Sequence, residues 1–184
     1  MFRQAASATV QRLQRLSPSS ATASASFIPQ HLLLVPSGVS KPSDQVAAEL
    51  ESLASAAQSA ATSVLCSSIL AGHTSESDEF GDTAIWLGPG AFGKGHEQAV
   101  LSSLGLEGGQ VSAVELSPQT HIPKTVNAST TTPELKALSA KLAELQDLYC
   151  FLLKTSGSDV VFSLIGKKAD NWTGLVSVGT WSDD

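Results

Sequence analysis

The sequence has no arginine after residue 43 and no acidic residue before residue 44. Residues 1–43 carry three arginines and one lysine, a net charge of +4, whereas residues 44–184 carry seven lysines against 17 acids, a net charge of −10. Direct nucleic-acid binding needs a basic surface that neutralises phosphates. The acidic, arginine-free part of the chain therefore argues against that function.

Cysteine and long apolar runs are also scarce. Two cysteines in 184 residues cannot form the disulfide framework of a small secreted module. No apolar run approaches the roughly 18 to 20 residues that cross a bilayer, so the sequence predicts no membrane span. With 42% hydrophobic residues, the length is sufficient for one core of ordinary size and one folded domain.

The first 40 residues are predicted to be a transit peptide and a disordered leader. On a helix, Ala6, Val10 and Leu13 fall on one face and the arginines lie opposite. Arginines, serines, an absence of acids and this amphipathic period are typical of an organelle transit peptide. We expect a mitochondrial location, with the plastid as the alternative, and removal of the leader between residues 20 and 41. A disordered cytosolic tail is the remaining interpretation.

Residues 42–184 are predicted to form a single α+β domain. The hydrophobic periods indicate a helix of about 20 residues after Pro42, a strand at 83–87, a weak helix at 97–104, a strand at 111–116, a long helix from Pro133 to Gly157, and a closing hairpin of 159–165 with 172–181. The closing strands are antiparallel and follow helices. This mixture favours a sheet with helices packed on it.

The glycine-rich segment 88–95 resembles two nucleotide-binding motifs. Residues 88–93 fit the dinucleotide fingerprint, and Glu115 follows about 20 residues later. However, Pro89 removes a backbone donor at the phosphate turn, and the chain then leaves the alternating strand and helix pattern. For a P-loop, Gly95 stands where a Ser or Thr would hold magnesium. We therefore favour a turn between strand and helix.

The histidines and cysteines predict neither a metal site nor a catalytic residue. Four histidines show no paired metal-ligand spacing, and we expect no cofactor. Cys66 lies in an apolar run and Cys150 in the predicted long helix, so both are expected to be small buried hydrophobic residues. A catalytic cysteine would need a lowered pKa and a nearby base. An enzyme is the least favoured class.

One loop concentrates the acidic residues. The sequence Ser75-Glu76-Ser77-Asp78-Glu79 places three carboxylates in five residues, with hydroxyls between them. An acidic surface suits a partner with a basic surface, because complementary fields accelerate encounter and suppress wrong pairings. Nucleic-acid enzymes have basic clefts that such a loop could occupy by imitating phosphate. A solvated loop without a partner is the alternative.

Several short motifs occur in a consistent order from Val46 to the C-terminus. The Ser-Glu-Ser loop comes after the first predicted helix of this part, and a strand containing Trp86 follows. The further motifs are His96-Glu97 with Val100-Leu101, Thr131-Thr132-Pro133, Leu164-Ile165-Gly166 and Asn171-Trp172-Thr173-Gly174-Leu175. In these motifs the chain resembles the nuclease A inhibitor family, small acidic proteins that block a sugar-nonspecific DNA/RNA endonuclease.

The resemblance implies a three-layer α/β/α sandwich with a mixed, largely antiparallel sheet. It also implies inhibition by carboxylates placed in a basic, metal-containing cleft, with Glu76 at the nuclease site and Asp184, at the chain end, near the catalytic metal. The other expected partner-binding residues are Ser75, Ser77, Asp78 and Glu79. A mitochondrial endonuclease is the expected partner. The alternative is an accessory or assembly subunit of a mitochondrial complex, since a shared fold does not fix function.

Overall fold

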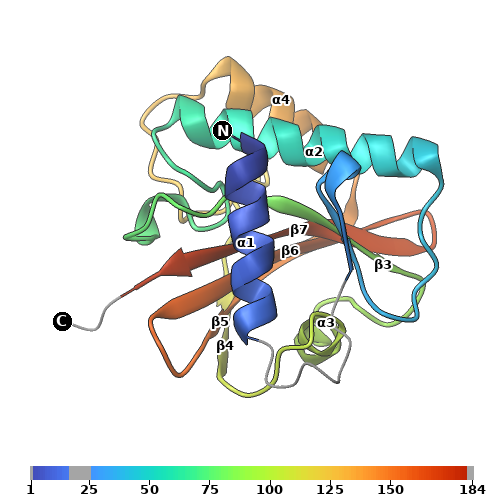
Figure 1. The fold of residues 1–184 in the computed structure, drawn as a ribbon. Coiled ribbons are helices and arrows are strands. Elements are labelled where there is room, and N and C mark those ends of the chain that lie inside the picture. The colour runs from blue at the N-terminus through green and yellow to red at the C-terminus, as the bar shows by residue number, and fades with distance from the viewer. Residues whose placement is uncertain (1, 17–25, 182–184) are drawn as a thin grey trace.

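The computed structural model describes residues 2–16 and 26–181 and contains helices together with one sheet (Figure 1). In chain order the elements are α1 (Phe2–Leu16), β1 (Ser26–Ile28), the short 3-10 helix η1 (Pro29–His31), β2 (Leu33–Val35), α2 (Asp44–Ser63), η2 (Gly72–Thr74), β3 (Thr83–Gly88), α3 (Glu97–Ser103), β4 (Gln110–Val114), α4 (Pro133–Leu142), β5 (Gln146–Lys154), β6 (Asp159–Lys168) and β7 (Asn171–Thr180). The predicted α+β class is therefore confirmed.

Within the described residues, the sheet has seven strands in the order β1-β2-β3-β7-β6-β5-β4. Only β2 and β3 pair in parallel, and all other neighbours are antiparallel. The predicted closing hairpin is confirmed: β6 and β7 pair from Asp159 opposite Thr180 to Lys168 opposite Asn171. Because β7 is the middle strand, its C-terminal end lies at the centre of one edge of the sheet.

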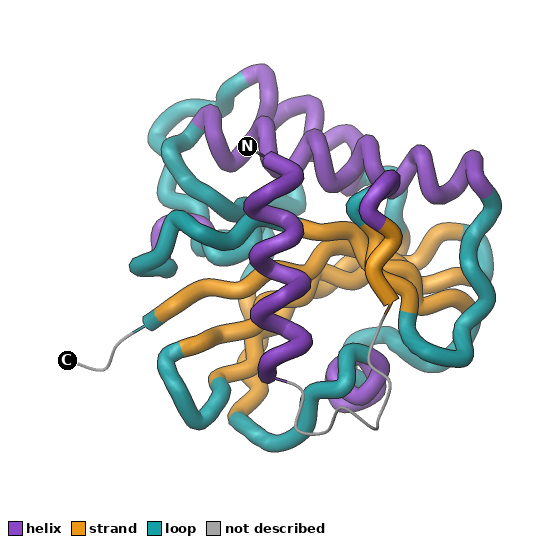
Figure 2. The backbone as a smooth tube through the Cα atoms, viewed as in Figure 1, coloured by secondary structure: helices purple, strands orange, loops and turns teal. Residues whose placement is uncertain are grey.

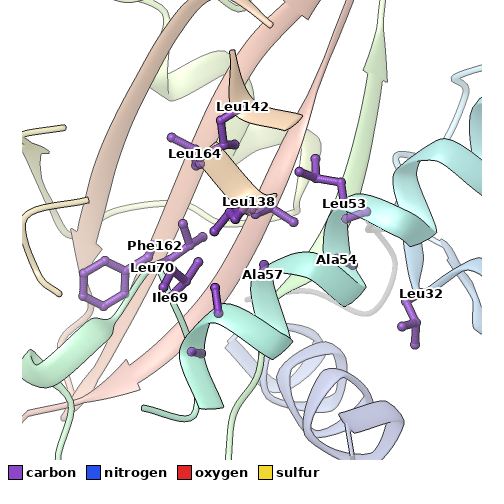
Figure 3. Close-up of a cluster of buried hydrophobic side chains, with 14 of the residues drawn as sticks. Leu32, Leu53, Ala54, Ala57, Ile69, Leu70, Leu138, Leu142, Phe162 and Leu164 are labelled. Atoms are coloured by element: carbon purple, nitrogen blue, oxygen red, sulfur yellow. The ribbon is translucent and has the colours of Figure 1, made fainter. Parts of the chain in front are cut away.

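Buried side chains form two clusters, one on each face of the sheet. Residues alternate between the faces along a strand, as the pleat requires: Phe162 and Leu164 belong to one cluster, and Val161 and Ile165 to the other. Helices α2 and α4 pack against each other over the first face (Figure 3). Residues of α1 and α3 belong to the second cluster, and Figure 2 shows α1 running across the strands.

Local sequence signals explain where α2 and α4 begin. The Ser43 hydroxyl accepts a hydrogen bond from the Val46 amide at 3.3 Å, which caps α2. The Thr132 hydroxyl accepts from the Leu135 amide at 3.1 Å, and Pro133 occupies the first helical turn of α4. Both helix starts agree with the predicted positions. Alanines that are fully buried along α2 allow the helix to lie close to the sheet.

The long helix predicted from Pro133 to Gly157 is wrong in its second half. Helix α4 ends at Leu142, and the later apolar residues with the same spacing belong to strand β5. Tyr149 and Phe151 stack on the face that carries α1, with ring centres 5.8 Å apart, while Cys150 points to the opposite face. Strand β5 is covered on both faces, so its apolar residues do not alternate with polar ones.

The prediction of a disordered leader is also wrong for the described residues. The apolar face of α1, with Ala6, Val10 and Leu13, is buried in the core, and β1 and β2 form one edge of the sheet. Helix α1 packs against β3 and β7 and runs down the front of the sheet in Figure 1. The amphipathic period that predicts a transit peptide therefore also describes a helix of the folded domain.

Polar contacts fix α1 in place. The buried Thr9 hydroxyl donates to the Gly81 carbonyl at 2.5 Å, and the Gly81 amide donates to the Ala5 carbonyl at 3.1 Å. The Arg12 guanidinium contacts both carboxylate oxygens of Asp159, at 3.0 and 3.1 Å. These bonds join α1 to the loop before β3 and to the start of β6. Specific polar contacts, in addition to apolar packing, therefore fix the position of α1.

Candidate functional site

The acidic loop 75–79 is bonded to the end of the middle strand. The Glu76 amide donates to the Thr180 carbonyl at 2.9 Å, and the Thr180 amide donates to the Ser75 hydroxyl at 3.1 Å. The side chains of Glu76, Asp78 and Glu79 are exposed. The loop and the last residues of β7 thus form one surface, at which the three carboxylates meet solvent.

The serines of the loop shape its backbone. The Ser75 hydroxyl accepts from the Ser77 amide at 3.2 Å, and the Ser77 hydroxyl accepts from the Glu79 amide at 3.1 Å. From outside the loop, the Ser67 hydroxyl donates to the Ser77 carbonyl at 3.3 Å. Such side-chain turns satisfy backbone amides locally. The serines therefore hold the loop in one shape and leave the carboxylates outside.

Five of the six predicted partner-binding residues are consecutive in the sequence and lie in the acidic loop. Ser75, Glu76, Ser77, Asp78 and Glu79 form the continuous loop described above. The sixth residue, Asp184, lies outside the described residues. Thr180 was not predicted as a site residue, because its role depends on a pairing between distant segments that no local pattern reveals.

Two hollows border the acidic loop. Ser75 and Thr180 line a hollow of about 530 Å³ on the sheet, together with Trp181, which is 44% exposed. The Lys154 ammonium lies 3.7 Å from the centre of the Trp181 ring, a cation–π contact. At its other end, the loop lines an open groove of about 880 Å³ between α1 and the C-terminal end of α2. The loop thus separates two recesses.

Asp82 anchors the segment that leads into the loop. Its fully buried carboxylate accepts hydrogen bonds from the Ser68 hydroxyl at 2.8 Å, the Ile69 amide at 2.7 Å and the Leu70 amide at 3.3 Å. Burial raises the pKa of Asp82 to about 6, and these hydrogen bonds oppose the rise. Asp82 is thus a positioning residue. Sequence reasoning missed it because one aspartate after a glycine carries no pattern.

The described residues offer no metal site. Within residues 2–16 and 26–181, no group of three or more His, Cys, Asp and Glu residues could hold an ion. His73 has both ring nitrogens in use: Nδ1 accepts from the Asn127 amide at 2.9 Å, and Nε2 lies 3.0 Å from the Val64 carbonyl. Because Nδ1 accepts a hydrogen bond, Nε2 is the ring nitrogen that donates to the Val64 carbonyl. His73 connects the end of α2 to the loop 117–132.

Neither thiol has the environment of a nucleophile. Burial raises the pKa of Cys66 to about 11, and the carboxylates of Asp82 and Asp78 add to this rise. Cys150 is buried in β5, and burial raises its pKa further above the usual range. A thiol of raised pKa stays protonated near neutrality and reacts slowly. This disfavours the hypothesis of a cysteine enzyme.

The glycine-rich loop packs on the sheet rather than forming a phosphate cradle. The Trp172 indole donates to the Gly90 carbonyl at 2.9 Å, and the Tyr149 hydroxyl donates to the Phe92 carbonyl. At Gly93, a β-carbon would lie 3.1 Å from the Trp172 ring, so a glycine suits this close contact. Helix α3 has only seven residues, and β3 lies between one parallel and one antiparallel neighbour. These features disfavour the dinucleotide interpretation.

Comparisons with known proteins add no relative. No model of a known protein family matches the chain, and no curated protein matches it. None of the helices in the described part of the chain is long and apolar enough to cross a membrane. By its fold and its site, the described part of the chain is an α+β domain with an exposed acidic loop bonded to the end of its middle strand.

Proposed function

We propose that this chain is a protein-interaction domain that inhibits a sugar-nonspecific DNA/RNA endonuclease. The carboxylates of loop 75–79 would occupy the basic, metal-containing cleft of the enzyme. One observation carries the proposal: Thr180 is hydrogen-bonded to both Glu76 and Ser75, which joins the acidic loop to the C-terminal end of β7. The resemblance to nuclease A inhibitors assigns contacts with the enzyme to Glu76, in this loop, and to Asp184, which follows the end of β7 in the chain.

The loop chemistry supports this role. Exposed carboxylates next to hydroxyls can pair with lysine, arginine and backbone amides, as a phosphate does. Because the serines already hold the loop in one shape, binding would cost little additional ordering. Glu76 is the residue proposed to pair with a basic side chain of the cleft. For Asp184 we keep the proposed approach to the catalytic metal, which the resemblance alone suggests.

The arrangement of layers is consistent with the family fold. Helices α2 and α4 cover one face of the sheet, and α1 and α3 contribute to the core on the other. We therefore include a three-layer α/β/α sandwich of the nuclease A inhibitor type in the proposal. The fold alone does not establish inhibition, since one fold can carry several functions.

The proposed location is the mitochondrion, with α1 as the import signal. In the folded chain, Val10 and Leu13 are buried, so an import receptor could bind the apolar face of α1 only before the chain folds. Because the domain uses α1, we expect the protein in the organelle to retain residues 2–16. Intact-mass measurement of protein purified from mitochondria checks this. A mature N-terminus between residues 20 and 41 would contradict retention and support a removable transit peptide.

The experiment that tests the function is affinity capture from isolated mitochondria, followed by a nuclease assay on the captured complex. The proposal expects a soluble one-to-one complex with a metal-dependent endonuclease and loss of its activity on both DNA and RNA. Comigration with a large membrane complex, without any nuclease, would instead support an accessory or assembly subunit.

Replacing Glu76 should weaken the complex without affecting the fold. For Glu76→Gln we expect a loss of binding free energy of about 2 to 3 kcal/mol, because a basic residue of the cleft would lose its charged partner. Titration of nuclease activity with the inhibitor measures the change. The matched control is Asp170→Asn, which removes one exposed negative charge at the opposite end of the β6–β7 hairpin. Equal inhibition by Glu76→Gln and the unmodified chain would disprove the assigned role.

A further inference from the structure

Leu65 is the most exposed large apolar residue in the described chain, with 91% of its surface accessible. Its backbone is also in the left-handed region, with φ of 63°. A side chain with a β-carbon is strained there, and glycine is the usual residue at such a position. Leu65 thus combines backbone strain with an apolar side chain in water. Each of these two features lowers the stability of the free domain.

The strain arises from the way α2 ends. The Leu65 amide donates to the Thr62 carbonyl at 3.2 Å, and the Cys66 amide donates to the Ala61 carbonyl at 2.8 Å. These two bonds form the Schellman motif, in which the residue after the helix cap adopts the left-handed conformation and is most often glycine. The motif depends on backbone atoms alone. A glycine at position 65 would therefore complete the helix end at least as well.

Leu65 borders the open groove of about 880 Å³ between α1, the end of α2 and the acidic loop. Asp78 and Glu79 line the same groove, and their exposed carboxylates give it a negative rim. Its remaining walls are small or polar: Gln4, Ala5, Ala8, Gln58, Thr62, Cys66 and Ser67. Among the residues that the structure describes, no basic side chain lines the groove. The apolar anchor and the negative rim therefore complement a segment that is both apolar and basic.

Gln58 supplies an unpaired acceptor in the wall of this groove. Its Oε1 atom is buried and has no hydrogen-bond partner among the described atoms. Buried acceptors without partners are rare in folded proteins and cost stability. Gln58 therefore brings unused hydrogen-bonding capacity to the wall of the groove.

We infer that Leu65 is the apolar anchor of the partner interface and that the groove beside it binds a segment of the basic partner in which an apolar residue adjoins a lysine or arginine. This inference rests on the proposed function and extends the binding surface from loop 75–79 to the end of α2. The apolar residue of the partner covers Leu65, and the adjoining cation pairs with Asp78 or Glu79. Binding then removes the exposed apolar surface that the free domain leaves in water.

The test uses a substitution whose effects on stability and on binding have opposite signs. Leu65→Gly relieves the backbone strain, so we expect the melting temperature to rise by about 2 to 4 °C. It also removes the anchor, so we expect the dissociation constant for the mitochondrial sugar-nonspecific endonuclease to rise about tenfold. Leu65→Met keeps an apolar side chain and should bind as the unmodified chain does. Thermal denaturation and calorimetric titration with the purified endonuclease give the two values.

The matched control is Ala169→Gly. Ala169 has φ of 55° in the turn between β6 and β7, at the opposite end of the hairpin from Thr180. This substitution should raise the melting temperature in the same way and leave the dissociation constant unchanged. A Leu65→Gly variant with a lower melting temperature, or with unchanged affinity while Glu76→Gln loses affinity, would overturn the inference and leave the proposed function in place. Failure of the unmodified chain to bind the endonuclease would overturn both.

Discussion

Deletion of residues 2–16 is expected to reduce the free energy of unfolding by more than about 5 kcal/mol, a large part of the 5 to 15 kcal/mol that is typical of a whole domain. Val10 and Leu13 lie in the same buried cluster as Phe80, Val176 and Val178, which would lose their cover. Each large apolar side chain that is exposed costs about 1.5 to 3 kcal/mol. This loss exceeds what an exposed tail could cause.

The deletion would also leave buried polar groups without partners. The Thr83 hydroxyl, which is fully buried, donates to the Ala6 carbonyl at 3.3 Å, and the Gly81 amide donates to the Ala5 carbonyl at 3.1 Å. An unsatisfied buried donor costs about 1 to 3 kcal/mol. The loop that connects Phe80 to β3 is therefore expected to become mobile, and amide hydrogen exchange in residues 80–84 should accelerate.

Chemical denaturation of the purified protein measures this effect, and a pair of neighbouring substitutions serves as its control. Leu13→Asp introduces a charge into the buried face of α1, whereas Gln14→Asp introduces the same charge on the exposed face. We expect Leu13→Asp to approach the loss caused by the deletion, and Gln14→Asp to change stability by less than about 0.5 kcal/mol. Equal stability of the deleted and full-length chains would show that α1 is only an import signal and does not stabilise the domain.

Helix α1 illustrates why composition alone misleads. The sequence correctly predicts an amphipathic helix in residues 2–16, but a basic composition does not distinguish a helix that binds an import receptor from one that covers a sheet. The deciding facts are contacts with residues about 70 or more positions away, such as Thr9 with Gly81 and Arg12 with Asp159. Strands β1 and β2 were not predicted, because each has only three residues and such a short segment shows no period in the sequence.

Strand β5 shows the second limit of sequence patterns. Leu135, Leu138 and Leu142 define a real helix face, and the next apolar residues happen to continue the same spacing. No glycine or proline marks the end of α4, and Asp147, the second residue of β5, is in the left-handed region, with φ of 53°. Pairing with β4 and β6 then decides the conformation of residues 146–154. Local propensity is a weak guide where tertiary pairing is this extensive.

The sequence predicts the acidic residues of the candidate site but not the other segments that lie beside them. Carboxylates in loop 75–79 are visible in the sequence, because the serines and acids are adjacent. The contact with Thr180 depends on the position of β7 at the middle of the sheet. Leu65 became notable only through its exposure and its backbone angle. Positions that depend on distant pairing or on strain leave no mark in a single sequence.

Asp82→Ala is expected to lower the free energy of unfolding by about 3 to 5 kcal/mol. The substitution removes the acceptor of the Ser68 hydroxyl and of the Ile69 and Leu70 amides, all of which are buried with it. Buried donors that lose a charged acceptor cost about 1 to 3 kcal/mol each. Asp82→Asn should cost less, because the amide oxygen still accepts while its NH₂ group opposes one of the donors. Chemical denaturation of both variants measures the difference.

The same residue should give the domain an unusual dependence on pH. The pKa of Asp82 rises from 3.8 in the unfolded chain to about 6 in the folded one, because burial disfavours the carboxylate. The folded state therefore binds the proton more tightly, and the stability that this group contributes is complete below pH 3.8 and is lost as the pH rises through about 6. Between pH 7 and pH 5, Asp82 should add about 1 kcal/mol to the free energy of unfolding.

Asp82→Asn isolates this contribution, since its amide does not titrate and every other carboxylate is unchanged. We expect the stability difference between the unmodified chain and Asp82→Asn to grow by about 1 kcal/mol from pH 7 to pH 5. Parallel stability curves would show that the carboxylate is charged over this whole range, held so by its three donors. Asp82 also orders residues 68–70 ahead of the acidic loop, so Asp82→Asn should weaken inhibition even where the domain is fully folded. Loss of stability without any loss of inhibition would mean that loop 75–79 is positioned by Thr180 and Ser67 alone.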